Sequence, residues 1–218
     1  HVHDCEQRSE DWYAVRLGRV CARRASDMLA TIKSGEAAGR RNLRAQLILE
    51  RLTGKSQERQ FQSQDMATGV EREAAAVALY EAATGVLLQR VGFISHPELQ
   101  AGASPDGIVG DWESFVEVKS PIPATHLEYL KTGKVPDDYW KQMLHLAWLT
   151  DMTSGVFVSY QPDFPESLQL KIVPVTYTTS RLAEHGEAVE VFLAEVEREL
   201  EALLTMSNLR GTLAAAVA

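Results

Sequence analysis

The sequence predicts an α/β fold in which a central mixed β-sheet is flanked by helices, built as one domain over residues 1–218. Three observations support this prediction. Helical periodicity dominates the chain up to about residue 84, strand patterns dominate residues 86–175 with helices among them, and an amphipathic helix follows at about residues 180–204. The length of the chain is sufficient for such a domain to bury a single core.

The N-terminal part, about residues 9–84, is predicted to be mainly helical. Its first helix begins near Ser9, where Glu10 and Asp11 favour the positive end of the helix dipole. The segment Lys55–Asp65 has no periodicity and is predicted to be a loop. The predicted helices are Ser9–Gly18, Ala25–Ile32, Arg41–Leu52 and Thr68–Thr84, the last of which ends at Gly85.

Strand signals follow, separated by turn residues. His96-Pro97 and Pro105-Asp106-Gly107 are turn sequences, so we expect the strands around them to form an antiparallel meander. The predicted strands are Val86–Leu88, Val91–Ser95, Gln100–Ser104, Gly107–Val109 and Phe115–Lys119.

Helices and strands alternate in the last part of the chain. A proline and two aspartates open the second of its helices, which is typical of a helix N-terminus. We expect helices at Pro123–Lys131 and Pro136–Thr150, strands at Gly155–Tyr160 and Leu168–Val175, a closing helix at Ser180–Leu204 and a frayed end at Ala214–Ala218.

Charge is distributed unevenly along the chain. The sequence has 22 Lys+Arg and 30 Asp+Glu, a net charge of -8. Residues 1–60 hold 12 basic and 8 acidic residues, a net of +4, which leaves 10 and 22, a net of -12, for residues 61–218. Because local potential steers a polyanion, the N-terminal basic residues either line a phosphate-facing surface or are ordinary solvated helix faces. These residues are Arg16, Arg19, Arg23, Arg24, Arg40, Arg41, Arg44, Arg51 and Lys55.

The remaining composition is that of a soluble globular protein. No apolar run approaches the roughly 18 to 20 residues of a membrane helix, and the polar start lacks a signal sequence, so we expect a cytoplasmic protein without membrane contact. Cys5 and Cys21 are expected to be reduced thiols, and two cysteines exclude a four-cysteine iron–sulfur cluster. His1, His3 and Cys5 could suggest zinc, but a frayed terminus is the preferred interpretation.

Three polar residues carry the most informative pattern of the sequence. Asp106 lies eleven positions before Glu117, and Lys119 shares a strand face with Glu117, while Val116 and Val118 point into a core. Two carboxylates beside an ammonium group suit a hard divalent cation such as Mg²⁺, which can polarise a phosphodiester and activate water. The pattern is compatible with phosphodiester hydrolysis, with Glu117 as an exposed site acid, but taken alone it favours a turn aspartate and a solvated strand face.

Five segments occur in the order found in one known family. They are Trp12-Tyr-Ala-Val-Arg16-Leu-Gly18, Gly69-Val-Glu-Arg-Glu73, Ser104-Pro105-Asp106-Gly107, Glu117-Val-Lys119 and Tyr139-Trp-Lys-Gln142. Asp106, Glu117 and Lys119 resemble the PD-(D/E)xK nuclease signature, and the ordered set resembles phage lambda exonuclease and the YqaJ-type viral recombinases over about residues 9–163. The resemblance implies a single nuclease domain with a restriction-endonuclease-like core.

The resemblance also implies catalytic roles. Asp106 and Glu117 would be metal ligands together with the carbonyl oxygen of Val118, and two Mg²⁺ ions are expected, which Mn²⁺ can replace. Lys119 would activate or position the attacking water. Glu73 would help to hold the metals, with a surface glutamate as the alternative, and Gln142 would support the lysine or a phosphate of the cleaved strand. By their spacing one and two turns after Gln142, His145 and Trp148 are expected to be packing residues, whereas His126 is left open as a packing residue or a ligand.

By the same resemblance, Arg16 would bind a terminal 5'-phosphate, because a guanidinium pairs bidentately with phosphate oxygens. Trp12 is expected to pack on the same helix, and Ser104 is a further candidate for substrate binding. The family usually supplies a small hydroxyl residue shortly after the arginine. This sequence has Val20-Cys21-Ala22-Arg23-Arg24 there, so either Arg23 or Ser26 takes that role.

The function implied by the resemblance is that of a metal-dependent 5'-to-3' exonuclease. Such an enzyme degrades one strand of linear double-stranded DNA from a 5'-phosphorylated end and leaves a 3' single-stranded tail for an annealing protein. The family relation also implies a homotrimer encoded by a phage or prophage and active in a bacterial cytoplasm. Two alternatives remain open: a restriction- or repair-type endonuclease with the same metal motif, and a catalytically silent DNA-binding module.

Overall fold

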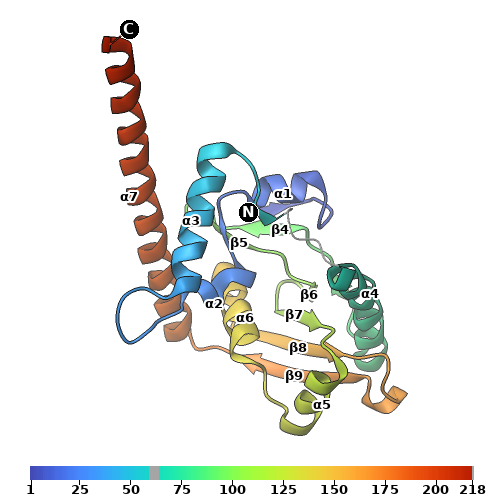
Figure 1. Cartoon of the computed structure of the whole chain (residues 1–218). Coiled ribbons are helices and arrows are strands. Elements are labelled where there is room, and N and C mark those ends of the chain that lie inside the picture. Colours follow the sequence, from blue (N-terminus) through green and yellow to red (C-terminus); the bar gives the residue numbers. More distant parts are fainter. Residues whose placement is uncertain (59–63, 218) are drawn as a thin grey trace.

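The computed structural model describes the backbone of residues 1–58 and 64–217, and the side chains of residues 1–58 and 72–207. Its strands form two mixed β-sheets flanked by helices (Figure 1). The predicted α/β class is therefore confirmed, but two sheets replace the single central sheet that the sequence predicted.

The larger sheet has five strands in the order β3-β6-β7-β8-β9. β7 and β8 are parallel, and the other neighbours are antiparallel. The strand β6 has the predicted bounds, and β7, β8 and β9 lie close to theirs. The strands are β3 (Leu88–Gln89), β6 (Gly107–Val109), β7 (Ser114–Lys119), β8 (Ser154–Tyr160) and β9 (Leu170–Thr176).

The smaller sheet has four short strands in the order β1-β4-β5-β2. They are β1 (Val2–His3), β4 (Phe93–Ser95), β5 (Ala101–Ala103) and β2 (Val20–Cys21). The prediction of one continuous meander was wrong here, because β4 and β5 pair with each other and with β1 and β2, which come from the N-terminus, and not with β6.

The N-terminus is ordered, so the prediction of a frayed end was wrong. The amino group of His1 donates to the carbonyl oxygen of Ser95 at 2.7 Å, and Nε2 of His3 bonds the hydroxyl of Ser95 at 2.8 Å. These contacts satisfy polar groups that a free end would leave to water.

The helices agree with the predicted set, apart from differences at several of their ends. The helix α2 ends at Met28 rather than Ile32, α4 begins at Gln64 within the predicted loop, and α7 continues to Val217 through the end that was predicted to be frayed. The helices are α1 (Glu10–Arg16), α2 (Ala25–Met28), α3 (Ala38–Thr53), α4 (Gln64–Thr84), α5 (Pro123–Thr132), α6 (Asp137–Thr150) and α7 (Thr179–Val217), with 3-10 turns at Ala22–Arg24 and Glu166–Leu168.

Helices cover both faces of the five-stranded sheet (Figure 1). On one face, Val116 and Val118 of β7 pack against α4 through Val77. On the other face, Phe115 and Phe157 pack against side chains of α6 and α5. Since β7 is covered on both faces, Phe115 to Val118 are all buried.

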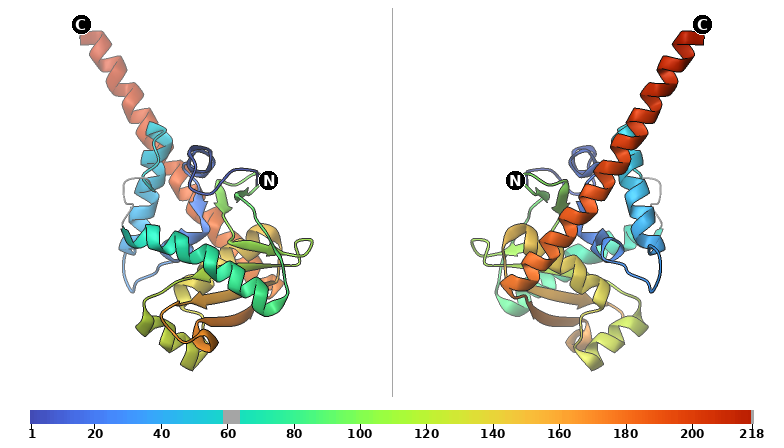
Figure 2. Two further views of the ribbon diagram at one scale, coloured as in Figure 1. Left: turned by 90° about the vertical axis from the view of Figure 1, so that its right-hand side faces the viewer. Right: turned by 90° about the vertical axis from the view of Figure 1, so that its left-hand side faces the viewer.

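The helix α7 runs past α3 and extends beyond the body of the molecule (Figure 2). Leu43 and Leu47 of α3 share a core cluster with Phe192 of α7. Arginines of α3 also pair with acidic residues of α7, namely Arg40 with Glu195, Arg44 with Glu199 and Arg51 with Glu197. Of the two alternatives that the sequence left open for these three arginines, a phosphate-facing surface and an ordinary helix face, the ion pairs with α7 favour the second. No helix in the described part of the chain is both long and apolar enough to cross a membrane.

One prediction follows from the close packing of β7 and β8. A Cβ atom added at Gly155 would lie 2.5 Å from a ring carbon of Phe115, its partner across the two strands. Phe115 is fully buried and cannot move aside. We expect Gly155→Ala to lower the free energy of unfolding by about 1–3 kcal/mol, measured by urea denaturation. Combining it with Phe115→Leu should recover part of this loss, whereas strictly additive losses would show that the two residues are not in conflict.

Candidate active site

The turn before β6 and the strand β7 bring Asp106, Glu117 and Lys119 together, as the sequence predicted. Gly107 pairs with Val116 in the antiparallel β6–β7 ladder, which places the Asp106 side chain beside the middle of β7. There Oδ2 of Asp106 accepts a hydrogen bond from the backbone N–H of Val118 at 2.6 Å. Lys119 Nζ donates to Oε1 of Glu117.

Both carboxylates are buried, which the sequence did not predict. Glu117 is 3 % exposed and Asp106 is 9 % exposed. The expectations of an exposed site acid and of a solvated strand face were wrong, because helices cover both faces of β7. A buried carboxylate pair is costly unless cations or hydrogen-bond donors surround it.

The pKa shifts of Asp106 and Lys119 are those expected where negative charge is concentrated in a buried site. Burial, followed by the nearby charge of Glu117, raises the pKa of Asp106, and Glu73 raises it further. Burial alone lowers the pKa of Lys119, but the charges of Glu117 and Asp106 outweigh burial, so that this pKa is raised. Lys119 is therefore a protonated donor in this arrangement, and the site favours additional positive charge.

Two further predicted residues reach this site from helices. Gln142 on α6 donates through Nε2 to Oε1 of Glu117. Glu73 on α4 pairs with Arg8 at 2.9 Å and is close enough to Asp106 to raise its pKa. The ring of Tyr139, one turn before Gln142, lies 5.2 Å from Lys119 Nζ.

The turn that carries Asp106 is held by donors from distant segments. Gln7 Nε2 donates to the carbonyl oxygen of Pro105 at 3.0 Å, and Arg90 Nη1 donates to that of Asp106 at 3.0 Å. Trp12 Nε1 donates to the hydroxyl of Ser104 at 2.8 Å. Ser104, predicted to bind substrate, thus anchors Trp12 of α1 to the active-site turn.

Arg16, at the end of α1, is buried beside Trp12. Its Cζ atom lies 3.9 Å from the centre of a Trp12 ring, and its side chain is 7 % exposed. Arg16 Nε and Nη2 donate to both carboxylate oxygens of Glu58 at 2.9–3.0 Å. Arg16 therefore has a bidentate partner within the chain.

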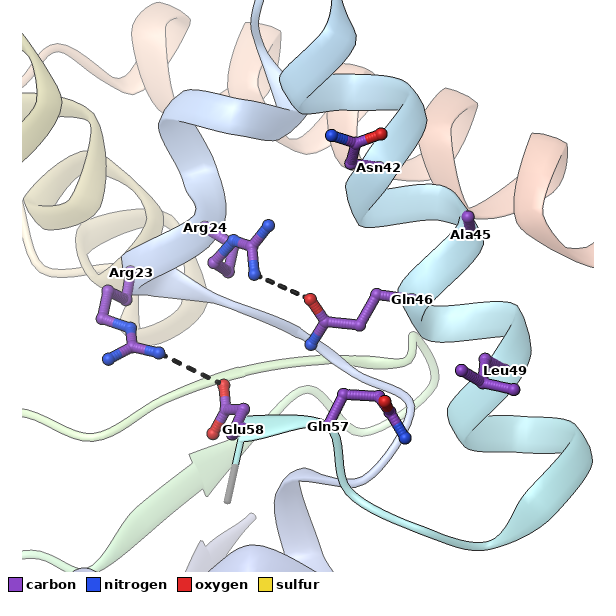
Figure 3. Close-up of a pocket in the computed structure, with 8 residues that line it drawn as sticks. All are labelled: Arg23, Arg24, Asn42, Ala45, Gln46, Leu49, Gln57 and Glu58. Atoms are coloured by element: carbon purple, nitrogen blue, oxygen red, sulfur yellow. Dashed lines mark hydrogen bonds and ion pairs between the residues drawn. The ribbon is translucent and has the colours of Figure 1, made fainter. Parts of the chain in front are cut away.

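A pocket of about 630 Å³ adjoins this ion pair (Figure 3). Arg23 projects into it and lies 3.9 Å from Glu58, and Arg24 donates to Gln46. Ser26, the alternative to Arg23, instead bonds Asp138 of α6. The pocket is lined by Arg23, Arg24, Asn42, Ala45, Gln46, Leu49, Gln57 and Glu58.

The residues at the carboxylate pair fit a hard divalent cation. Asp106, just before β6, and Glu117, on the adjacent strand β7, provide oxygen donors, and burial, followed by the charge of Glu117, raises the pKa of Asp106, so that added positive charge would be favourable there. No cluster of three or more His, Cys, Asp or Glu side chains suited to a metal occurs among the residues whose side chains are described. A complete coordination shell would therefore need backbone oxygen, such as that of Val118, water or substrate.

Three histidines of α5, α6 and α7 are buried in the structure, including His145, which was expected to be a packing residue, and His126, which the sequence left open. His126 is held by Ser159 and by the carbonyl oxygen of Leu168. His145 Nδ1 and His185 Nε2 lie 3.0 Å apart, and their other ring nitrogens are buried without a hydrogen-bond partner. This histidine pair joins α6 to α7 and lies in one aromatic cluster with Trp148.

Sequence reasoning missed Glu58, Arg8 and Tyr139. Glu58 lies at the edge of a segment without periodicity, and its partner Arg16 is 42 positions away. Arg8 lies outside the five segments that resemble the family. Tyr139 is the first residue of the last of these segments, but the sequence predicted no role for it. These three side chains can be recognised as part of the site only from their contacts in the structure.

The family model described as the YqaJ-like viral recombinase domain matches residues 11–153. A comparison with curated proteins found no match.

Solved structures gave clear matches. An alkaline exonuclease from Laribacter hongkongensis is 38% identical, with a TM-score of 0.84 over 92% of this chain and 98% of that chain, and its complex with dAMP matches equally. A phage-related exonuclease from Haemophilus somnus is 12% identical, with a TM-score of 0.64 over 85% of this chain and 96% of that chain. The last match concerns the fold alone.

Proposed function

The chain belongs to the YqaJ-like viral recombinase domain family, and on that premise we propose that it is a Mg²⁺-dependent 5'-to-3' exonuclease of double-stranded DNA. The membership and the likeness to an alkaline exonuclease support a nuclease of the exonuclease type with a restriction-endonuclease-like fold. The observation that carries the proposal is the buried carboxylate pair of Asp106 and Glu117, to which Lys119 and Gln142 add hydrogen bonds through Glu117.

Each residue of this arrangement has a role that its position supports. Asp106 and Glu117, with the carbonyl oxygen of Val118, would hold two Mg²⁺ ions, which Mn²⁺ can replace. Bound metal would supply Lewis acidity at the scissile phosphate and lower the pKa of water. Lys119, a cation, orients water or stabilises charge that develops on the phosphate. Gln142 fixes the Glu117 carboxylate, and Glu73 adds negative charge nearby.

The polarity of the proposal depends on Arg16. A buried guanidinium that pairs bidentately with an oxyanion is suited to a terminal 5'-phosphate. Arg23 lies 3.9 Å from the Glu58 carboxylate that also pairs with Arg16, which supports the proposal that Arg23 takes the role of the hydroxyl residue of the family. Trp12 stacks on Arg16 and bonds Ser104, so it links the proposed end-binding group to the turn of Asp106.

The product of this reaction would be a duplex with a 3' single-stranded tail. We propose that such tails serve recombination by strand annealing, with an annealing protein as partner. A homotrimer around the DNA, a phage or prophage origin and a cytoplasmic site of action complete the proposal. They rest on the family relation.

Digestion of strand-labelled DNA tests the proposal. Linear duplexes labelled on one strand at a time and closed circular DNA would be incubated with and without Mg²⁺. We expect Mg²⁺-dependent loss of label from 5' ends only, with circles untouched. Nicked or linearised circles would show an endonuclease, and intact DNA of both kinds would indicate a silent DNA-binding module.

Replacing Arg16 tests how the end is recognised. We expect Arg16→Ala to reduce the preference for 5'-phosphorylated over 5'-hydroxyl duplexes by roughly 10- to 150-fold, since a charge-assisted contact contributes about 1.5–3 kcal/mol. The preference would be measured as a ratio of kcat/KM values. Arg41→Ala, which removes an exposed arginine of α3, is the matched control and should leave the ratio unchanged. An unchanged ratio in Arg16→Ala would assign the recognition to another group.

A further inference from the structure

Glu58 occupies the position that a bound phosphate would need. Two of its oxygens accept from Nε and Nη2 of Arg16, the edge of the guanidinium that also binds phosphate bidentately. The pair is shielded, with Arg16 7 % and Glu58 13 % exposed, and Arg23 lies 3.9 Å from the same carboxylate. An oxyanion site is therefore filled by an oxyanion of the chain itself.

Arg16 cannot turn to meet a phosphate elsewhere. Its guanidinium is stacked on Trp12, which is itself fixed by the hydrogen bond to Ser104. The guanidinium is also buried within the fold. A phosphate that binds Arg16 must come to this position and replace the carboxylate.

A pocket beside Glu58 has room for its side chain. Its side chain lies at the wall of the pocket of about 630 Å³, whose other walls carry Arg23 and Arg24 (Figure 3). The backbone before it is anchored, since Glu50, only 3 % exposed, accepts from the N–H of Gln57 at 2.9 Å. The side chain can therefore leave Arg16 while the segment that carries it stays in place.

We propose that the Glu58 carboxylate is an internal competitor for the terminal 5'-phosphate and moves into the adjacent pocket when a DNA end binds. This inference rests on the proposed function, because it assumes that Arg16 reads the end. The inference adds Glu58, as a residue that determines specificity, to the proposed recognition of the 5'-phosphate by Arg16.

The arrangement has two consequences. Without DNA, Glu58 neutralises Arg16, so the fold does not carry a buried unpaired cation. A tethered carboxylate also has a high effective concentration, so free inorganic phosphate competes poorly with it. A phosphate that is carried by DNA adds the contacts of the duplex, whereas a neutral 5'-hydroxyl end displaces nothing.

Glu58→Gln tests the inference because it keeps the size of the side chain and removes its charge. Binding of 5'-phosphorylated and 5'-hydroxyl duplexes by the full chain would be measured without divalent ions, so that no cleavage occurs. We expect the variant to bind the phosphorylated duplex about tenfold or more tightly than the wild type, with little change for the hydroxyl duplex. Inorganic phosphate should raise the melting temperature of the variant at concentrations that leave the wild type unchanged.

Two further variants keep the inference distinct from the proposed function. Glu36→Gln, which also removes a carboxylate paired with an arginine, Arg44, is the matched control and should alter neither measurement. Glu58→Ala should act in the same direction as Glu58→Gln. The inference would be overturned if both Glu58 variants bound phosphate no more tightly than the wild type and Arg16→Ala lost the preference for 5'-phosphorylated ends. If Arg16→Ala kept the preference, the end-reading part of the proposed function would fail instead.

Discussion

Replacing Glu117 with glutamine is expected to reduce DNA hydrolysis by about a thousandfold or more, because an amide removes one of the two charges available to hold the metal. The substitution keeps the volume of the side chain on a strand whose two faces are covered. Lys119 and Gln142 both donate to this carboxylate, so they also lose their charged acceptor. The activity would be measured as single-turnover digestion of a linear duplex.

Folding should survive this substitution. Since the charge of Glu117 raises the pKa of Asp106, its removal relieves repulsion between the two carboxylates in the metal-free protein. We therefore expect an unchanged or higher melting temperature, together with much weaker stabilisation by Mg²⁺. Glu113→Gln, an exposed acid of the same hairpin, should leave both the activity and the Mg²⁺ effect unchanged. A Glu117→Gln variant with full activity would remove Glu117 from the proposed metal site.

The second large effect is a loss of stability in acid caused by the buried histidine pair. Burial, and then the neighbouring imidazole of His185, lowers the pKa of His145. Burial, with a contribution from Arg181, lowers the pKa of His185 to about 4. The unfolded chain therefore binds protons below about pH 6.5 that the folded protein does not bind. Stability is present in full above that pH and falls as the pH decreases.

The expected slope is about 1.4 kcal/mol per pH unit for each histidine, and for His185 the loss continues down to about pH 4. Urea denaturation at a series of pH values from about 7 to about 5 would measure it. Both rings lie against Trp148, and the charges of His96 on His145 and of Arg181 on His185 add to the lowering of their pKa values. A double variant, His145→Leu with His185→Leu, should lose less stability over this range. Parallel slopes in the variant and the wild type would assign the acid sensitivity to other groups.

The hairpin of the active site could be predicted because its signals are local. Turn residues place Asp106, and the period of two along β7 places Glu117 and Lys119 on one face. The helix that carries Gln142 was recognisable by its proline and acidic start. The positions of these residues follow from the residues next to them in the sequence.

The smaller sheet and the burial of Glu117 depend on contacts between distant segments. The strands β1 and β2 have two residues each, too few to show any alternation, and their partners lie about 80 to 90 positions away. Glu117 is buried because α4 and α6 cover opposite faces of its strand, which no strand pattern reveals. Arg40 and Arg44 likewise needed the position of α7 to show that they pair with acidic residues of that helix.

The hydrogen bond between Trp12 and Ser104 makes the group proposed to hold the DNA end and the group proposed to cut it parts of one rigid unit. If the proposed roles hold, the distance between the bound end and the cleaved bond would be fixed by the fold. The number of nucleotides in each released product would then be the same for every DNA sequence.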